Sequence, residues 1–255
     1  MNNAITVQNL TKRYKGADKA AVDNISFSVG PGEFFAFLGQ NGAGKTTTIS
    51  ILTTTLAKTS GSVTVAGHDL DAGARDIRSN IGIIFQRPSL DLDLSAEENI
   101  RLHACMYGLY GYRPLFRWMP KSYRDRVIRL AEIVGIQDKL QKPLKTFSGG
   151  MQRKIEIIRS LIHQPAVLFL DEPTLGLDPL SRHSLWEYIN EKRKEYGTTV
   201  FLTTHYIDEA ENVDKVCMIQ EGRIVFSGTP GEMKTQTRGS SLEDAYINVL
   251  TGGAV

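Results

Sequence analysis

The segment from Gly39 to Thr46 carries residue types that can bind a nucleotide phosphate. It reads Gly-Gln-Asn-Gly-Ala-Gly-Lys-Thr and matches the pattern G-x-x-x-x-G-K-[ST] in full. Glycines let backbone N–H groups converge on phosphate oxygens, and a helix that begins here adds its positive end. Lys45 would place a charge at the β- and γ-phosphates, and the hydroxyl of Thr46 would bind Mg²⁺. The alternative is a chance glycine turn, but a predicted strand precedes the segment and a predicted helix follows it.

A second motif places two acids directly after an apolar run. Val167–Leu170 is followed by Asp171 and Glu172. A phosphate loop needs a carboxylate for the metal and a group that orders the attacking water, and we assign these roles to Asp171 and Glu172 respectively. A solvated turn could also hold two adjacent acids, but the four apolar residues before them favour a buried strand. Together the two motifs predict hydrolysis of a nucleoside triphosphate.

A third motif, Phe147-Ser-Gly-Gly-Met151, precedes a predicted helix. Ser148 as the helix cap, with Gly149 and Gly150 beside it, creates another helix N-terminus that accepts anions. One chain does not need two such sites for one triphosphate. The second site is therefore expected to face a nucleotide held by another copy of the protein.

These motifs need strands and helices to position them. Residues 4–37 alternate apolar and polar side chains, which predicts short antiparallel strands that include Phe35 and Phe37. A helical texture follows from about residue 88 to residue 164. Further elements are expected as a helix at Thr46–Leu56, strands at Val63–Val65, Ile81–Phe85, Val167–Leu170 and Thr199–Leu202, and a hairpin of Val216–Ile219 with Ile224–Phe226 around Glu221–Gly222.

The order of these elements predicts an α/β fold, with a mostly parallel sheet and an antiparallel addition near the N-terminus. We expect a single domain over residues 1–255. Its core and antiparallel β subdomain would comprise residues 1–87 and 165–230, and an inserted helical subdomain would comprise residues 88–164. A short helical extension is expected at residues 231–255.

The extension is predicted to contain one docking helix at Ser241–Leu250. Ser240 and Glu243 have the spacing of a capping box before that helix.

Composition excludes several classes of protein. The 255 residues are 41% hydrophobic and 23% charged, as in an ordinary globular protein, and the net charge of +2 gives no strong field toward nucleic acid. Cys105 and Cys217 lie in apolar surroundings and are expected to be buried, reduced thiols. No signal peptide or membrane-spanning run is visible, so a reduced intracellular compartment is expected and any membrane must come from a partner.

The sequence resembles the ATP-binding cassette family over nearly its whole length. Any single match is weak, but all occur in the order that the family shows. They are Tyr14, the phosphate loop GQNGAGKTT, Gln86 after a predicted strand, FSGGM, Asp171-Glu172, Pro173-Thr-Leu-Gly-Leu-Asp178, and His205 after the strand Thr199–Leu202.

The resemblance implies a RecA-like P-loop core and a head-to-tail dimer closed over two ATP molecules. One copy would hold each ATP through its phosphate loop, and the other through its FSGGM segment. The resemblance thereby assigns nucleotide binding to Tyr14, which would stack on adenine, and to Asn41, Gly42, Ala43, Gly44, Lys45, Thr46, Thr47, Ser148, Gly149 and Gly150.

The same resemblance assigns the catalytic and coupling roles. Glu172 would polarise the attacking water, and His205 would contact the γ-phosphate. Asp178 would link the two ATP sites, while Gln86 would sense Mg²⁺ and water and move the helical arm. Met151 departs from the glutamine that most of the family carries, and a thioether cannot donate the hydrogen bond that glutamine would make across the interface.

The resemblance leaves two classes of function open. The first is the ATPase subunit of a membrane transporter, held at the cytoplasmic face of the membrane by separate integral subunits. The strand-turn-strand Gly222–Pro230 and the helix at Ser241–Leu250 resemble the branch that exports drugs, lipids, peptides or polysaccharides. The second is a soluble ATPase acting on ribosomes or DNA, which is disfavoured by the single set of motifs and the absence of sustained heptads. A catalytically silent regulatory module is a third, disfavoured because the acids and Lys45 are present.

Residues 107–129 are not explained by the family pattern. They contain six aromatic residues and six Lys or Arg residues against one acid, Asp125. One interpretation is a structured surface loop whose rings cover the helical arm. The other is a contact with the membrane partner or with anionic lipid headgroups. A nucleic-acid surface is a poorer interpretation, because one loop does not make a basic face.

Overall fold

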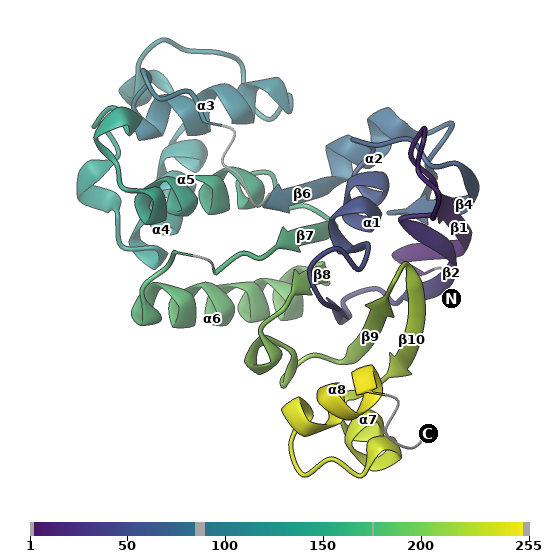
Figure 1. Cartoon of the computed structure of the whole chain (residues 1–255). Helices are drawn as coiled ribbons and strands as arrows, with labels where there is room; N and C mark the ends of the chain where they lie inside the picture. The colour runs from purple at the N-terminus through teal and green to yellow at the C-terminus, as the bar shows by residue number, and fades with distance from the viewer. Residues whose placement is uncertain (1–2, 85–89, 175, 252–255) are drawn as a thin grey trace. The chain divides into compact units, whose positions relative to one another are not determined.

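The chain folds as an α/β protein with two β-sheets (Figure 1). The computed structural model describes residues 3–84, 90–174 and 176–251. The larger sheet has the strand order β10-β9-β3-β8-β7-β6, and the smaller has the order β2-β1-β4-β5. The strands are β1 (Ile5–Lys12), β2 (Val22–Val29), β3 (Phe34–Leu38), β4 (Ser60–Val65), β5 (His68–Asp69), β6 (Ile81–Ile84), β7 (Val167–Asp171), β8 (Thr199–Thr204), β9 (Lys215–Gln220) and β10 (Arg223–Gly228). Parallel pairing in the centre of the larger sheet and antiparallel pairing in the smaller one agree with the expected α/β fold class.

Two compact units make up the chain. The first, Met1–Ile83 with Ala166–Glu172 and Gly197–Val255, contains both sheets, and the second, Ile84–Pro165 with Pro173–Tyr196, is helical. The first unit has helices α1 (Lys45–Leu52), α2 (Ala74–Asn80), α7 (Pro230–Thr237) and α8 (Leu242–Thr251), and the second has α3 (Ala96–Met106), α4 (Lys121–Ile133), α5 (Gly149–Leu161) and α6 (Pro179–Tyr196). Helix α6 belongs to the helical unit, whereas residues 165–230 were predicted to belong to the core. Within the described ranges, no helix combines the length and the apolar character that crossing a bilayer requires.

The centre of the larger sheet is apolar on both faces. Every residue of β3, β7 and β8 is buried. Strand β3 pairs in parallel with β8 and with β9, and β7 pairs in parallel with β8. Phenylalanine rings pack between the two sheets of this unit, with ring centroids as close as 5.2 Å, and the rings are those of Phe27, Phe35, Phe37, Phe169 and Phe201.

Strand β3 corrects the prediction that Phe35 and Phe37 belong to the antiparallel strands. Only β1 and β2 form the expected antiparallel pair in this part of the chain. Phe34 and Ala36, which alternate with the two predicted positions, are equally buried. A strand covered on both faces has no polar alternation, so the period-two pattern did not reveal it.

Helix α7 was not predicted, although its start carries a clear local signal. Thr229 accepts a hydrogen bond from the Glu232 backbone N–H, and the Glu232 carboxylate accepts one from the Thr229 N–H. Pro230 occupies the first turn, where a missing N–H costs nothing. This capping box therefore fixes the first of two C-terminal helices, where one had been expected.

The capping box proposed at Ser240 and Glu243 is wrong by one residue. The backbone N–H of Asp244 donates to the Ser241 hydroxyl at 3.0 Å, and α8 begins at Leu242. Ser240 instead donates its hydroxyl to the Asp244 carboxylate. Two serines in succession gave two possible caps, and the packing of buried Leu242 selects the second.

Both cysteines are free thiols, but only Cys217 is buried as expected. Burial raises the pKa of the Cys217 thiol to about 12, so it stays protonated in the folded state. Cys105 is half-buried, because it lies on the side of α3 next to the exposed Leu102 and Met106.

Candidate functional site

The glycine-rich loop lies between β3 and α1, where its glycines meet neighbouring backbone. A Cβ at Gly39 would lie 2.4 Å from the Ile219 carbonyl oxygen, and a Cβ at Gly44 would lie 2.5 Å from the Ala21 carbonyl oxygen. Gly44 is also the N-cap of α1, with φ of 111°. Larger residues are excluded at both positions, so the loop keeps its backbone close to the first turn of α1.

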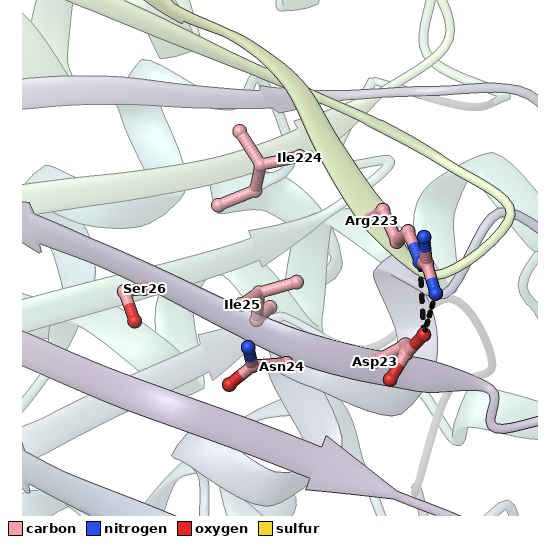
Figure 2. Close-up of a pocket in the computed structure, with 6 residues that line it drawn as sticks. All are labelled: Asp23, Asn24, Ile25, Ser26, Arg223 and Ile224. Carbon is pink, nitrogen blue, oxygen red and sulfur yellow. Dashed lines mark hydrogen bonds and ion pairs between the residues drawn. The ribbon is translucent and has the colours of Figure 1, made fainter.

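The turn between β9 and β10 completes this loop. The Gly222 N–H donates to the Ala43 carbonyl at 2.9 Å, and the Gly222 carbonyl accepts from the Asp23 N–H at 2.8 Å. Figure 2 shows Arg223 on β10 pointing toward Asp23 on β2, with 2.7 Å between the guanidinium and the carboxylate. These two residues border an open cavity of about 520 Å³. The hairpin predicted around Glu221–Gly222 is thus confirmed, and its turn supports the phosphate loop.

Lys45 is buried at the start of α1. Its ammonium donates to the carbonyl oxygens of Gly39, at 2.5 Å, and Gln40, at 3.0 Å. Burial lowers the pKa of Lys45, while the negative charges of Glu172 and Asp171 raise it in part. The positive charge therefore lies in the field of both predicted acids, which is the arrangement that a phosphate-binding lysine needs.

The two acids lie at the carboxyl end of β7, beside the end of β8. Asp171 is paired with Thr203 in the parallel register, and the Thr203 hydroxyl donates to the Asp171 carboxylate. Glu172 has a left-handed backbone with φ of 49°, and its N–H donates to the Thr203 carbonyl at 3.0 Å. Its Oε1 lies 2.7 Å from Nδ1 of His205. The structure thus brings together Glu172 and His205, which the sequence placed far apart.

Thr46 and Asp171 together offer the oxygen atoms that could bind Mg²⁺. Thr46 is exposed in the first turn of α1, and Asp171 ends the neighbouring part of the sheet. Hydroxyl and carboxylate oxygens are hard ligands of the kind that Mg²⁺ prefers. Asn41 and Gly42, the other predicted loop residues, are also exposed.

Tyr14 lies close to the phosphate loop. Its hydroxyl is 3.3 Å from the Thr47 hydroxyl, and 44% of the residue is exposed. The Lys12 ammonium lies 5.3 Å from the ring centroid. An exposed ring tied to the first turn of α1 is consistent with the predicted stacking on a base, which stays a prediction.

The FSGGM segment begins α5 in the helical unit. The Ser148 hydroxyl caps the helix by accepting from the Met151 N–H at 3.4 Å. A Cβ at Gly150 would lie 2.4 Å from the Gly176 carbonyl oxygen. Gly149 has no atom within 4 Å of such a Cβ. Gly150 is thus required by packing within this unit, whereas Gly149 leaves open space for an anion.

Met151 contacts a lysine of its own unit. Its sulfur is 3.8 Å from the Lys139 ammonium. This contact does not replace the hydrogen bond that the usual glutamine would make, so the prediction that one contact is lost remains.

Asp178 caps α6. Its carboxylate accepts from the N–H of Ser181 at 2.9 Å and from the Ser181 hydroxyl at 2.6 Å, and the Lys154 ammonium lies 3.3 Å away. The Ser181 hydrogen bonds hold the pKa of Asp178 well below its ordinary value. Its predicted role in linking two ATP sites is not tested by these contacts. Gln86, the other predicted coupling residue, lies outside the described residues.

The aromatic and basic segment 107–129 divides into an inner and an outer set. Tyr123 is fully buried and donates to the Glu97 carboxylate at 3.0 Å, and burial raises its pKa. The rings of Tyr110 and Phe116 pack edge-on against it. The outer set is exposed and includes Tyr112, 62% exposed, and Trp118, 51% exposed.

Two residues of this site were not predicted from the sequence. Thr203 binds Asp171 through its hydroxyl, and Gly222 binds the phosphate loop through its N–H. Thr203 lies two residues before His205, but three of the six residues of β8 are threonines, so its hydroxyl gave no distinct signal. No pattern within residues 39–46 could have indicated Gly222.

A family comparison identifies the region that holds most of these residues. The family model described as ABC transporter matches residues 22–175, more than half of the chain. A protein described as a probable multidrug ABC transporter ATP-binding protein, YbhF of Escherichia coli, is 35% identical over 96% of this chain. The chain spans only 41% of the length of that relative.

Two further similarities cover more of the matched proteins. The Nod factor export ATP-binding protein I of Ralstonia nicotianae is 36% identical over 95% of this chain and 72% of its own length. A solved structure described as an ATP binding subunit of an ABC transporter has a TM-score of 0.86 at 30% identity, covering 97% of this chain and 99% of that one.

Proposed function

The chain belongs to the ABC transporter family, and on that premise we propose that it is the ATP-binding and ATP-hydrolysing subunit of an export transporter. The observation that carries this proposal is the contact of 2.7 Å between Glu172 and His205, at the ends of β7 and β8. The buried Lys45 lies in the field of the same acids. A phosphate loop, a water-activating carboxylate and a histidine that orients it form a hydrolytic site.

Each of these side chains has a step in the hydrolysis. Lys45 neutralises charge that grows on the β- and γ-phosphates. Glu172 orients the water that attacks the γ-phosphorus and accepts its proton. His205 holds the Glu172 carboxylate in place and would contact the γ-phosphate. The left-handed backbone of Glu172 is uncommon for a residue other than glycine, and such conformations cluster at functional sites.

Mg²⁺ would be held by Thr46 and Asp171 together with the phosphates of ATP. When bound, it supplies Lewis-acid charge that stabilises the transferring phosphoryl group.

We further propose that two copies of the chain close head to tail over two ATP molecules. The N-terminus of α5, with its Ser148 cap and the open face of Gly149, is a second anion site that a single phosphate loop does not use. It would bind the γ-phosphate held by the partner copy. Asp178, at the start of α6, would then lie near the dimer interface.

A stable ATP-bound dimer tests this mechanism. The Glu172→Gln variant keeps a hydrogen-bonding side chain but cannot accept the proton from water. We expect ATP with Mg²⁺ to convert this variant from monomer to dimer in gel filtration with light scattering, while ATPase activity falls about 10³-fold. The Lys45→Ala variant should stay monomeric under the same conditions. A strictly monomeric Glu172→Gln protein that still binds ATP would refute the sandwich dimer.

The transport partner is proposed to be a separate set of integral membrane subunits. The names of the relatives, multidrug transport and Nod factor export, support export as the direction. Attachment to such subunits would place the chain at the cytoplasmic face of the membrane. The outer set of segment 107–129, with Tyr112, Arg117 and Trp118, would add contact with anionic lipid headgroups.

Purification from the native cells distinguishes this proposal from the soluble alternative. Tagged Glu172→Gln protein, extracted with detergent and ATP, should copurify with a polytopic membrane protein at about one copy per cassette. Recovery of ribosomes or DNA instead would favour the second class of function and leave the ATPase mechanism intact.

A further inference from the structure

We propose that Thr203 is a positioning residue for the metal-binding carboxylate of Asp171. The inference rests on the proposed ATPase function and concerns the same site. Thr203 lies outside the motifs, and in this proposal its hydroxyl determines the affinity of the site for the nucleotide-bound metal.

The sheet places these two side chains together. Strands β7 and β8 are parallel neighbours, and Asp171 is directly paired with Thr203 at their carboxyl ends. Paired residues of neighbouring strands project from the same face of the sheet. The Thr203 hydroxyl therefore reaches the Asp171 carboxylate and donates to its Oδ1.

Burial makes this contact decisive. Thr203 is fully buried, and Asp171 is only 4% exposed. A buried carboxylate has little water to fix its rotamer, so a donor from the protein sets which oxygen remains directed at the metal. The bond from the Thr203 hydroxyl to Oδ1 holds the carboxylate in one orientation, and this orientation sets how the carboxylate would meet the metal.

The main chain of Thr203 has a separate task. Its carbonyl accepts the Glu172 N–H at 3.0 Å. A substitution that removes only the hydroxyl leaves this backbone bond in place. The side chain of Thr203 should thus govern metal affinity, while its backbone continues to hold the general base.

The test is the Thr203→Val variant, which keeps the β-branched shape and loses the hydroxyl. Binding of Mn²⁺ to the complex of protein and ADP is measured by electron paramagnetic resonance, which does not depend on turnover. We expect the Mn²⁺ affinity to fall about tenfold, the effect typical of a lost outer-shell partner. ADP binding in EDTA should be unchanged, and Thr203→Ser should restore the wild-type Mn²⁺ affinity.

ATPase kinetics should show a change in the Mg²⁺ requirement without a change in kcat. The Mg²⁺ concentration for half-maximal ATPase should rise in Thr203→Val, and kcat at saturating Mg²⁺ should return close to that of the wild type. Thr199→Val is the matched control, since Thr199 is a buried threonine of the same strand whose hydroxyl accepts the Gly32 N–H at 3.0 Å. It should leave both Mg²⁺ and Mn²⁺ constants unchanged.

Folded Thr203→Val protein with wild-type Mn²⁺ affinity would overturn the proposal, as would failure of Thr203→Ser to restore it. Thr203→Ala replaces the valine variant if thermal unfolding shows that the latter does not fold. A wild-type protein that binds neither ADP nor Mn²⁺ would instead refute the ATPase function itself.

Discussion

Lys45 shows how a single residue can serve both the fold and the chemistry. It is only 6% exposed, yet it carries a charge into the space between the phosphate loop and the acids at the end of β7. Its hydrogen bonds to two loop carbonyls hold the loop in the shape that a triphosphate would meet. Those carbonyls and the phosphate oxygens would compete for the same three donors.

Replacing Lys45 with methionine keeps the length of the side chain and removes its charge. We expect ATP affinity to fall about 100-fold, because a hydrogen bond to a charged group contributes about 1.5–3 kcal/mol and more than one is lost. Isothermal titration calorimetry with ATP measures the effect. Lys58→Met removes a half-buried lysine that is paired with Asp71 away from the phosphate loop; it is the control and should bind ATP normally. If Lys45→Met bound ATP as tightly as the wild type, the glycine-rich loop would not be part of the nucleotide site.

Some residues of the site could be predicted from the sequence, and others could not. Lys45 and Thr46 belong to a contiguous pattern whose spacing is set by one phosphate group, so eight residues suffice to recognise them. Thr203 meets Asp171 only through strand pairing across a gap of 32 residues. Such a contact depends on register, and Thr203 is one of three threonines in its strand, so the sequence alone does not indicate which of them meets Asp171.

At the scale of single elements, α3 shows how one turn can anchor a helix. Ser95 accepts the Glu98 N–H at 3.2 Å, and the Glu98 carboxylate accepts the Ser95 N–H at 2.8 Å. The same carboxylate accepts the Ser95 hydroxyl at 2.7 Å. These bonds, led by that of the hydroxyl, lower the pKa of Glu98 from its ordinary value of 4.5.

Ser95→Ala should lower the free energy of unfolding by about 1 kcal/mol at neutral pH, the usual effect of a lost cap. The folded-state pKa of Glu98 lies below its unfolded value, so its contribution is present above pH 4.5 and is lost as the pH falls through the lowered value. The gap between wild type and variant should therefore narrow in acid. Urea unfolding at neutral pH and at an acid pH measures the difference in the free energy of unfolding between wild type and variant. The control is Ser122→Ala, which changes an exposed serine of α4. A gap that widens in acid would contradict this account.

Helices and strands were predicted correctly where the hydrophobic pattern of the sequence matched the burial of the residues in the fold. The hairpin of β9 and β10 was found because a turn dipeptide separates two short apolar runs. Strand β3 was placed in the wrong sheet because burial on both faces removes alternation. Helix α7 was overlooked because its eight residues have few apolar positions, and its capping box was the better signal.

At the scale of the whole molecule, segment 107–129 is the surface that the family pattern leaves unexplained. Its inner ring, Tyr123, is part of the helical core, whereas Tyr112 and Trp118 face solvent. The Arg117 guanidinium lies 5.8 Å from the Trp118 ring centroid. Packing on the helical arm is therefore confirmed for the inner set, whereas contact of the outer set with lipid or with a membrane partner stays a prediction.

The outer set can be removed without touching the inner one. Tyr112→Ala with Trp118→Ala should keep the ATPase activity of the isolated subunit and reduce its binding to phosphatidylglycerol-containing vesicles about 100-fold, since two partly buried rings at about 1.5 kcal/mol each contribute about 3 kcal/mol together. Flotation with vesicles of phosphatidylcholine, with and without phosphatidylglycerol, measures this. Phe116→Ala is unsuitable, because that ring packs against Tyr123.

The control for this surface is Tyr196→Ala, at the end of α6, where an exposed tyrosine lies outside the segment. It should bind vesicles as the wild type does. If wild type and all variants bind equally to vesicles with and without phosphatidylglycerol, the lipid contact is refuted. Contact with a protein partner would then be the remaining interpretation of the outer set.

The turn at Gly222 also bears on how the protein is made. The phosphate loop is translated early, but strands β8 and β9, which flank β3, and the N–H that meets Ala43 are translated much later. A nascent chain thus carries its nucleotide motif for most of its synthesis without the neighbours that close it. ATP can stabilise only a formed site, so nucleotide cannot assist folding until the ribosome has passed residue 222. Until β8 and β9 have been made, the apolar strand β3 also lacks its two pairing partners, which leaves it prone to aggregation.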